Sequence, residues 1–354
     1  MKKIIFLIAV MLGTNAVLAQ ANSKKTDLKP RVIVLATGGT IAGSGESSTE
    51  ASYSAGEIPI EQLLNAVPQI HEVANITGEQ ISNIGSQNMT PKIWLKLAKR
   101  INEIFAHDKA DGIVITHGTD TQEETAYFLS LTVQSDNPVV LVGAMRPATA
   151  LSQDGNRNLL DAVRVAAAPE SQGVGTVVAM NEKIFAARDV TKTSTTNVAA
   201  FKSRNFGPIG VIHDGQVSYY YKSLRKPEKK FDVSNLNHLP QVEIAYGYAG
   251  ASPAAVEAFV NTGADGIVFA GVGNGNFNKP VGKALASAVD QGLVVCRSSR
   301  VGSGKVTLNN EVDDDKYGFV VADDLNPQKA RVLLMLALTK THDRNEIQHM
   351  FFTY

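Results

Sequence analysis

Two threonines lie at positions where a side-chain hydroxyl could take part in chemistry. Thr40 follows an apolar run and two glycines in "RVIVLATGGTIAG", residues 31–43. Thr119 follows Gly118 at the end of a second apolar run, in "DGIVITHGTD". Because glycine lets the backbone approach a bound group closely, each Gly-Thr step predicts one of two things. It is either a loop that holds a nucleotide phosphate or a threonine that attacks a substrate.

The spacing of the glycines argues against nucleotide binding. A dinucleotide fingerprint reads G-x-G-x-x-G, but residues 38–43 read "GGTIAG" and place Thr40 at the middle glycine. The glycines of "GVGNGN", residues 271–276, stand too close together. "SRVGSGKV", residues 299–306, lacks the first glycine and the final Ser or Thr of a phosphate loop.

Metal and cofactor chemistry finds little support in the residue types. The 7 histidines are scattered and there is a single cysteine, whereas zinc sites gather several such ligands. We therefore expect no metal and no cofactor. We interpret His117 as a strand-end residue that hydrogen-bonds the backbone, and Cys296, in "GLVVCRSS", as a buried inert thiol.

Hydroxyl chemistry remains. A threonine hydroxyl becomes a useful nucleophile when a nearby base removes its proton, and the chain shows neither a Ser-His-Asp arrangement nor a G-x-S-x-G elbow. The other groups near predicted strand ends are Tyr53, Thr119, Asp120, Lys192 and Glu311. A lysine held near Thr119 and kept neutral by burial could act as the base.

The elements that must position these groups follow from the hydrophobic pattern. Continuous apolar runs predict strands covered on both faces, as in parallel sheets. The runs are "VIVLAT", "GIVITHG", "PVVLVGAM", "GTVVAM", "VEIAYGY", "GIVFAGVG" and "LVVCRSS". Helical stretches between them predict an α/β fold. We expect a larger, doubly wound N-terminal domain with a mostly parallel sheet and a smaller C-terminal α/β domain. Ligands of such sheets bind beyond the carboxyl ends of the strands, where both Gly-Thr steps lie.

Three helix starts are predicted from capping patterns. Thr90 and Pro91 open residues 90–105, whose apolar face is Ile93, Leu97, Ile101 and Ile104. Thr121 and Glu124 form a capping-box pattern. Asn326 and Pro327 open residues 326–341 in the same way as the first helix.

The chain divides into five predicted segments. Lys2 and Lys3, an apolar run and small residues predict a signal peptide over 1–21, cleaved after Ala19 or Ala21, with an uncleaved membrane anchor as the alternative. A leader (22–30), an N-terminal domain (31–220), a polar linker (221–240) and a C-terminal domain (241–354) follow. We expect an exported, periplasmic protein without a membrane segment once the signal is removed.

Charge and loop composition bound the partners. Lys and Arg number 34, as do Asp and Glu, so the chain lacks the basic excess of a nucleic-acid-binding protein. The Gly- and Ser-rich stretch "AGSGESSTEASYSAGE", residues 42–57, is either an exposed loop or a mobile lid beside a site.

Taken together, the motifs resemble the bacterial type II L-asparaginases. The motifs are "ATGGTIAG", "GSQNM", "ITHGTDTQEETAYFL", "VGAMRP", "RDVTKTSTT", "GVGNGN", "RSSR", "EVDDDKYGF" and "LNPQKARVLL". The resemblance runs from Arg31 to Tyr354. It implies an amidohydrolase that converts L-asparagine to L-aspartate and ammonia. Family members with a disulfide in the N-terminal domain have cysteines that this chain lacks.

The resemblance also implies the role of each site residue. Thr40 would be the nucleophile and form a β-aspartyl ester, Tyr53 would hydrogen-bond its hydroxyl, and Lys192 would assist proton movement within a cluster with Thr119 and Asp120. Ser86 would hold the substrate α-carboxylate, while Gln87, Asp120 and Glu311 would hold the α-ammonium. The Thr119 N–H would stabilise the oxyanion and the Ala144 carbonyl would hold the departing amide. Asn276 and Glu311 would come from a neighbouring subunit of a homotetramer built from intimate dimers.

Two alternatives stay open at this level. A glutaminase-asparaginase would accept L-glutamine as well as L-asparagine. An exported, non-catalytic amino-acid-binding protein would share the signal and the two-domain build, but would not need Thr40, Thr119 and Lys192 together.

Overall fold

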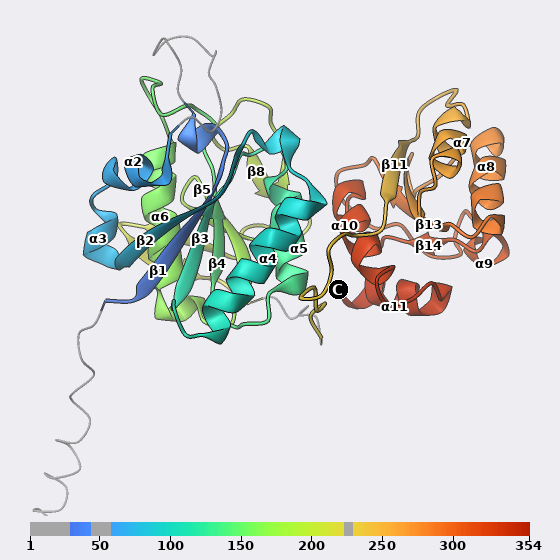
Figure 1. Cartoon of the computed structure of the whole chain (residues 1–354). Helices are drawn as coiled ribbons and strands as arrows, with labels where there is room; N and C mark the ends of the chain where they lie inside the picture. Colours follow the sequence, from blue (N-terminus) through green and yellow to red (C-terminus); the bar gives the residue numbers. More distant parts are fainter. Residues whose placement is uncertain (1–28, 44–57, 223–228) are drawn as a thin grey trace, which may run out of the picture.

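The computed structural model describes residues 29–43, 58–222 and 229–354. Two α/β units follow one another along the chain, each with its own sheet (Figure 1). The fold class predicted from the sequence is therefore confirmed. The predicted signal peptide, most of the leader and most of the glycine-rich loop with Tyr53 lie outside the described residues.

The N-terminal sheet has eight strands in the order β10-β9-β6-β5-β4-β3-β1-β2. The five strands from β2 to β5 pair in parallel, and the other three pair antiparallel. Their bounds are β1 Arg31–Gly38, β2 Asn75–Ile84, β3 Gly112–Thr116, β4 Val139–Val142, β5 Thr176–Met180, β6 Lys183–Ala186, β9 Gly210–His213 and β10 Gln216–Tyr219.

The parallel strands reverse their order between β1 and β3. From β1 the chain moves outward to β2 and then returns to β3 on the other side of β1. Such a reversal leaves a crevice at the carboxyl ends of the two strands, where α/β proteins bind their ligands. Ala36 pairs with Thr116 in the register of β1 and β3, so Thr40 and Thr119 follow at the same edge of the sheet.

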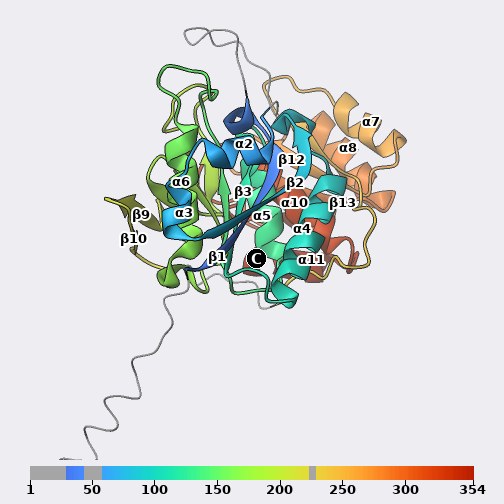
Figure 2. The ribbon, with the colours of Figure 1, turned by 60° about the vertical axis from the view of Figure 1, so that its left-hand side comes forward.

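Helices cover both faces of this sheet (Figures 1 and 2). On one face lie α2 (Ile60–Asn65), α3 (Ile70–Val73) and α6 (Gly155–Ala167), and on the other lie α4 (Pro91–Ala106) and α5 (Gln122–Thr132). Short 3-10 turns are η1 (Thr40–Ala42), η2 (Ser86–Asn88) and η3 (Pro169–Ser171).

The predicted start of α4 is confirmed, and Leu97, Ile101 and Ile104 of its predicted face are buried, whereas Ile93 is only partly buried. Thr90 Oγ1 accepts a hydrogen bond from the N–H of Ile93 at 3.4 Å, and Pro91 is the first helical residue. Trp94, rather than Ile93, is buried beside Leu97 and Ile101. The Trp94 ring stacks on Phe128 of α5 with centroids 5.3 Å apart, so the larger aromatic side chain takes the core position.

The capping box predicted at the start of α5 is wrong. Thr121 precedes the helix, but its side chain caps no N–H of the first turn. Its Oγ1 instead donates to the carbonyl of Ser86 at 2.8 Å. A contact between two strand-end loops has replaced a local one, which the local sequence pattern could not reveal.

A small antiparallel pair stands apart from the main sheet. It consists of β7 (Val190–Lys192) and β8 (Phe201–Ser203). β7 carries Lys192 at its end.

The C-terminal unit is a four-stranded parallel sheet in the order β11-β12-β13-β14. Its strands are β11 Val242–Tyr246, β12 Gly266–Gly271, β13 Val294–Ser299 and β14 Val320–Val321, and its helices are α7 Ala254–Asn261, α8 Lys279–Asp290, α9 Asp314–Tyr317, α10 Pro327–Ala337 and α11 Arg344–Thr353. The predicted Asn326 cap is confirmed, because its Oδ1 accepts from the N–H of Lys329 at 3.0 Å. Cys296 is fully buried in β13, where burial raises the pKa of its thiol, as expected for an inert residue.

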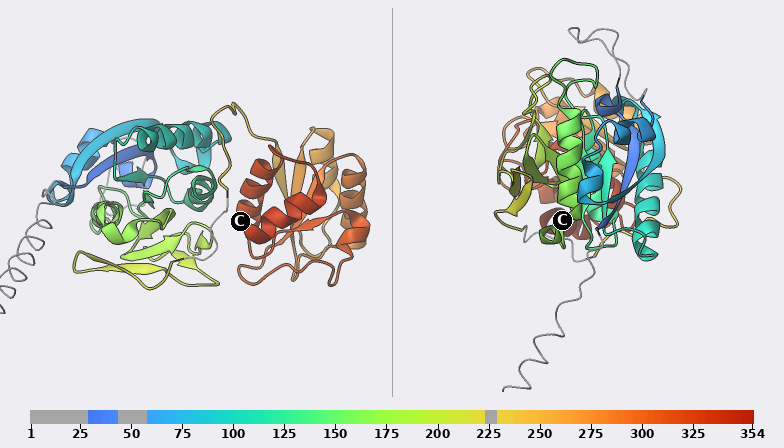
Figure 3. Two further views of the ribbon diagram at one scale, coloured as in Figure 1. Left: turned by 90° about the horizontal axis from the view of Figure 1, so that it is seen from below. Right: turned by 90° about the vertical axis from the view of Figure 1, so that its left-hand side faces the viewer.

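Helix α10 joins the two units by packing against α5. The left view of Figure 3 shows the two units side by side. Two ion pairs lie in this interface. Lys329 Nζ is 3.6 Å from Glu123 Oε2, and Arg188 Nη1 is 2.5 Å from Asp324 Oδ1. All four side chains are at least largely buried.

Candidate active site

The glycines of the two Gly-Thr steps pack the strand ends against each other. Gly38 and Gly39 have φ of 106° and 84°, in the left-handed region that favours glycine. A Cβ on Gly39 would lie 2.2 Å from the N of Gly118, and one on Gly118 would lie 2.5 Å from Ser86 Oγ. Only glycine permits these approaches, which bring together the loops after β1, β2 and β3.

Thr40 opens the 3-10 turn η1 directly after this contact and is only 6% exposed. The next residue, Ile41, is buried, as is Ala144. Both side chains pack against Gly155, where a Cβ would lie 3.1 Å from Ile41 Cγ1 and 3.3 Å from Ala144 Cβ. The segment after β4 therefore joins the same crevice. Gly143 adds to it, since a Cβ there would lie 3.1 Å from Thr119 Cγ2.

Lys192 reaches this crevice from β7. Its Nζ donates to Thr119 Oγ1 at 2.9 Å and to Asp120 Oδ1 at 2.6 Å. The Lys192 side chain is 17% exposed and that of Asp120 is 57% exposed, so the ion pair has one buried and one solvated end. The structure thus brings together Thr119, Asp120 and Lys192, as the sequence analysis predicted.

Ser86 fills the space between the loops after β2 and β3. Its buried Oγ accepts from the N–H of Asp120 at 3.2 Å. Gln87 follows in η2 and is exposed. The Ser86 hydroxyl therefore lies at the backbone of Asp120, and a hydroxyl together with a carboxylate suits a ligand carrying both charges of a free amino acid.

Asn276 and Glu311 form a separate pair in the C-terminal unit. Asn276 Nδ2 donates to Glu311 Oε2 at 2.5 Å, and Glu311 is exposed. Among the described residues, these side-chain hydrogen bonds join the two residues to each other and not to Thr40 or Thr119. Tyr53 lies outside the described residues.

His117 is a neutral structural residue, as interpreted from the sequence. Its Nδ1 donates to the carbonyl of Gly118 at 2.7 Å, since a carbonyl can only accept. Its Nε2 then accepts from Thr125 Oγ1 at 2.9 Å, and Thr125 in turn accepts from Trp94 Nε1 at 2.8 Å. Complete burial lowers the pKa of His117 to about 4. The ring therefore holds the backbone just before Thr119 without carrying charge.

Residues that fix β7 were missed in the sequence. Thr191 Oγ1 donates to Glu123 Oε1 at 2.9 Å, and the buried Lys329 donates to the carbonyl of Val190. Asn326 Nδ2 donates to Glu123 Oε2 at 2.9 Å. Burial lowers the pKa of Lys329, with Glu123 opposing that shift. The only sequence signal was Lys329 in the first turn of the largely apolar helix "PQKARVLLMLA", and its partner lies on a distant part of the chain.

The described residues include no group of three or more His, Cys, Asp or Glu side chains placed to hold a metal ion. No helix in the described ranges has the length and apolar character needed to cross a membrane.

The fold and the cluster define an enzyme of the α/β class, with hydroxyl, lysine and carboxylate groups at the switch point of a parallel sheet. Comparison with protein families is specific. Residues 31–225 match the family description "Asparaginase, N-terminal", and residues 241–351 match "Glutaminase/Asparaginase C-terminal domain". The chain belongs to the asparaginase family and is an amidohydrolase.

Several relatives extend over nearly the whole chain. It is 56% identical to "L-asparaginase 2" of Escherichia coli over 327 residues, which covers 92% of this chain and 93% of the relative. It is 55% identical over 329 residues to the "Probable L-asparaginase periplasmic" of Haemophilus influenzae, with 91% and 92% covered. It is 46% identical over 344 residues to a "Glutaminase-asparaginase" of Pseudomonas fluorescens, with 96% and 94% covered.

A solved structure shares the fold. The crystal structure of a probable cytoplasmic L-asparaginase from Campylobacter jejuni superimposes with a TM-score of 0.89 at 51% identity. The match covers 92% of this chain and 100% of the other.

Proposed function

We propose that this amidohydrolase converts L-asparagine to L-aspartate and ammonia, with Thr40 as the nucleophile. The observation that carries the proposal is the contact of Gly39 with Gly118. It joins the glycines that directly precede Thr40 and Thr119, and Lys192 Nζ donates to the Thr119 hydroxyl. The similarity to proteins named L-asparaginase supports the choice of substrate.

The substrate is bound through its two backbone charges. Ser86 is buried, and its Oγ accepts a hydrogen bond from the N–H of Asp120 and donates one to the α-carboxylate. Asp120, Gln87 and Glu311 take the α-ammonium. Opposite charges on ligand and site give hydrogen bonds about twice as strong as neutral ones, which fixes the side-chain amide against Thr40.

The chemistry proceeds in two displacements. The Thr40 oxygen attacks the amide carbon, and its proton passes through the Thr119 hydroxyl to Lys192 as Lys192 gives one of its own protons to the amide nitrogen. The Thr119 N–H stabilises the oxyanion, and the Ala144 carbonyl holds the amide nitrogen. The carbon–nitrogen bond breaks when the nitrogen has gained a proton, and ammonia leaves a β-aspartyl ester on Thr40. Water then attacks the ester carbon, the carbon–oxygen bond to Thr40 breaks, and L-aspartate and the free hydroxyl are formed.

Tyr53 completes this proposal by hydrogen-bonding the Thr40 hydroxyl. Asn276 and Glu311 serve the site of a neighbouring subunit within a homotetramer. The exposure of Glu311 supports this, because its carboxylate is accessible to another chain.

The proposal that the protein is exported rests on its first residues, which have the pattern of a signal peptide. One relative is named periplasmic and the solved neighbour is named cytoplasmic, so the names of relatives divide on location.

A second candidate is a glutaminase-asparaginase, favoured by the relative of that name at 46% identity. L-asparagine and L-glutamine differ by one methylene, and an enzyme can discriminate between two such substrates by about 1–3 kcal/mol in transition-state binding. Comparison of kcat/KM for L-asparagine and L-glutamine decides between a selective and a broad enzyme.

The mechanism is tested by replacing the nucleophile. Thr40→Ala should fold normally and lose several orders of magnitude in ammonia release, since no ester can form. Rapid quenching of the native enzyme with L-asparagine should yield a β-aspartyl adduct on the peptide containing Thr40. Normal turnover by Thr40→Ala would exclude the mechanism.

A further inference from the structure

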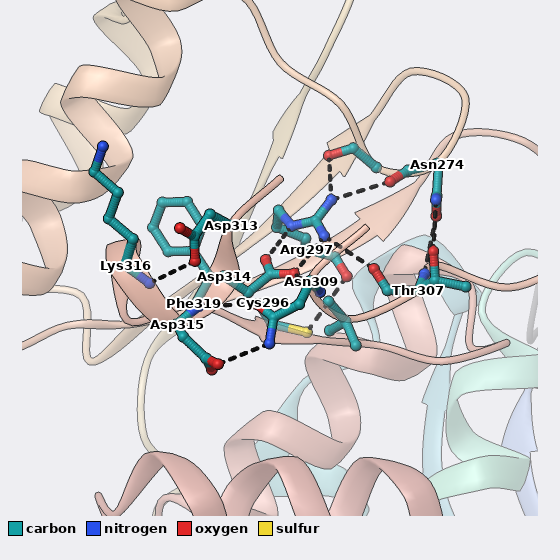
Figure 4. A network of polar contacts seen from close by, with 12 residues as sticks. Asn274, Cys296, Arg297, Thr307, Asn309, Asp313, Asp314, Asp315, Lys316 and Phe319 are labelled. Atoms are coloured by element: carbon teal, nitrogen blue, oxygen red, sulfur yellow. Dashed lines mark hydrogen bonds and ion pairs between the residues drawn. The ribbon is translucent and has the colours of Figure 1, made fainter. Parts of the chain in front are cut away.

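A buried ion pair in the C-terminal unit has no part in the chemistry described above. Arg297 lies in β13 and Asp314 in α9, and their side chains are 1% and 0% exposed. Arg297 Nε donates to Asp314 Oδ1 at 2.5 Å, and Nη2 donates to Oδ2 at 2.8 Å (Figure 4). Removing two charges from water costs several kcal/mol per ion, so a purely structural role would be served as well by apolar side chains.

The rest of the guanidinium binds backbone carbonyls of two loops. Nη1 donates to the carbonyls of Asn274 at 3.0 Å and Gly275 at 3.2 Å, and Nη2 donates to that of Thr307 at 3.3 Å. Every N–H of the side chain is therefore used. Gly275 has φ of 74°, and a Cβ on it would lie 3.1 Å from Nη1. The loop can approach the arginine this closely because the residue is glycine.

The first of these loops ends at Asn276. Val272 and Asn276 exchange backbone hydrogen bonds of 3.0 Å and 2.8 Å, which close the turn around the carbonyls held by Arg297. The position of the Asn276 side chain thus depends on the turn that the guanidinium fills.

The second loop leads to Glu311, and both residues of the ion pair hydrogen-bond its backbone. Asp314 Oδ2 accepts from the N–H of Asn309 at 2.9 Å, two residues before Glu311. The loops are also joined directly, because Asn274 Oδ1 accepts from the N–H of Thr307 at 2.9 Å and Asn274 Nδ2 donates to Thr307 Oγ1 at 2.6 Å (Figure 4).

We propose that Arg297 and Asp314 are positioning residues that set Asn276 and Glu311 in the bonded geometry needed to receive the substrate α-ammonium. This inference rests on the proposed function, in which those two residues bind substrate. Arg297 itself is too deeply buried to touch a ligand, so it acts through the two loops. Lysine cannot replace it, because an ammonium has fewer donors and no fixed plane.

The test compares the fully assembled enzyme with five variants, the last of which combines Arg297→Lys with Glu311→Ala. Arg297→Lys keeps the charge beside Asp314 but loses the fork of carbonyl contacts. Arg297→Met with Asp314→Leu removes both buried charges together and keeps the proposal testable if the lysine variant folds poorly. Glu311→Ala is the reference for loss of the substrate contact. Gln348→Leu is the matched control, because Gln348 is buried in the same unit and hydrogen-bonds both the N–H and the carbonyl of Val321.

KM and kcat for L-asparagine, the Kd for L-aspartate and the melting temperature are measured for each protein. Misplacement of a binding group by about 1 Å can cost about a hundredfold, so the two ion-pair variants should raise KM and Kd by about tenfold or more while kcat changes less. Gln348→Leu should lower the melting temperature and leave KM unchanged. Added to Glu311→Ala, Arg297→Lys should raise KM far less than it does alone, because residues acting as one unit are not additive.

Three outcomes overturn the inference. If Glu311→Ala raises KM and both ion-pair variants leave it unchanged, the pair is scaffold only and the proposed function stands. If the effects of Arg297→Lys and Glu311→Ala multiply fully, the arginine acts by another route. If Glu311→Ala leaves KM unchanged, the substrate contact itself is wrong, and the positioning role falls with it.

Discussion

Lys192 is the residue whose chemistry is best defined by its contacts. Its ammonium lies between the Thr119 hydroxyl and the Asp120 carboxylate. A group that only balances charge could be arginine as well as lysine, whereas a group that gives up and regains a proton could not, because a guanidinium does not deprotonate in proteins.

Substitution of Lys192 separates these roles. Both Lys192→Met and Lys192→Arg should lower kcat by about 10²- to 10⁴-fold, the range for loss of general acid–base catalysis, with a smaller change in Kd for L-aspartate. Lys202→Met, an exposed lysine on the neighbouring strand β8, is the control and should be as active as the native enzyme. Near-native kcat in Lys192→Arg would assign the lysine an electrostatic role only.

His117 gives a prediction on pH. Its pKa is lowered by burial from 6.5 to about 4, so between these values the unfolded chain binds a proton that the folded chain does not. Above pH 6.5 His117 is neutral in both states and does not lower the free energy of unfolding. As the pH falls from 6.5 toward 4, His117 lowers that free energy by up to about 1.4 kcal/mol per pH unit.

Melting temperatures of the native protein and His117→Gln, recorded from pH 7 to pH 4.5, test this. The native protein should lose more stability than the variant over this range. The comparison cancels groups common to both proteins. One is Glu124, whose pKa is raised by burial to about 7 and whose contribution therefore has the opposite sign, falling as the pH rises from 4.5 to 7. Parallel curves for the two proteins would show that His117 titrates normally.

The sequence could predict site residues where local pattern and chemistry coincide. Thr40 and Thr119 follow glycines at the ends of apolar strands, and such positions are read directly. Glu123 and Lys329 could not be predicted, because they are separated by most of the chain and meet only when α5 packs against α10. A buried charge in a single sequence gives no indication of its partner.

At the scale of elements, β7 is too short to hold Lys192 in place by its own pairing with β8. Three side chains from α5 and from the start of α10 hold it instead: Glu123, Asn326 and Lys329. Lys192 is thus located by the contact between the two units.

Single and double substitutions test whether Glu123 and Lys329 act as an ion pair. Glu123→Gln and Lys329→Met each leave a buried group without its partner and should lower the free energy of unfolding by about 3–5 kcal/mol. The double variant should lose less than the sum of the two, because no unpaired charge remains. Its kcat should still fall, since β7 has lost its anchors. Denaturant unfolding and steady-state kinetics give both quantities, and fully additive losses would mean that the two residues do not act as a pair.

Elements were predictable where burial alone decides them. The largely apolar runs of the sequence correspond to seven strands: β1, β3, β4, β5, β11, β12 and β13. The runs did not include the short strand β14 or the antiparallel strands β6, β9 and β10. Strand β2 escaped this pattern because it lies at the edge of the sheet, where most of its residues are at least partly exposed. The start of α5 was assigned the wrong cap because Ser86, from a different loop, competes for the Thr121 hydroxyl.

At the scale of the whole molecule, the two units divide the proposed work. The N-terminal unit holds Thr40, Thr119 and Lys192 at one switch point, and the C-terminal unit holds Asn276 and Glu311 on a scaffold built around Arg297 and Asp314. No hydrogen bond within the described chain joins the two sets. The proposal that a second copy completes the site comes from the family resemblance, because the sequence of one chain does not reveal a neighbouring subunit.

Mixed assemblies decide whether the site is shared. In a two-fold dimer each site takes Thr40 from one subunit and Glu311 from the other. A dimer of one Thr40→Ala subunit and one Glu311→Ala subunit then contains one site with both changes and one site with neither. About half of the sites in the purified mixed dimers should be active, because each mixed dimer has one intact site of two. The two variants carry different affinity tags, are refolded together and are purified through both tags before ammonia release is measured. The control mixes Thr40→Ala with Lys192→Met, whose changed residues belong to one cluster of one subunit, so these hybrids should stay inactive. Inactive hybrids in the first mixture as well would mean that Glu311 serves the cluster of its own chain, and that the domains of a single chain must close to complete the site.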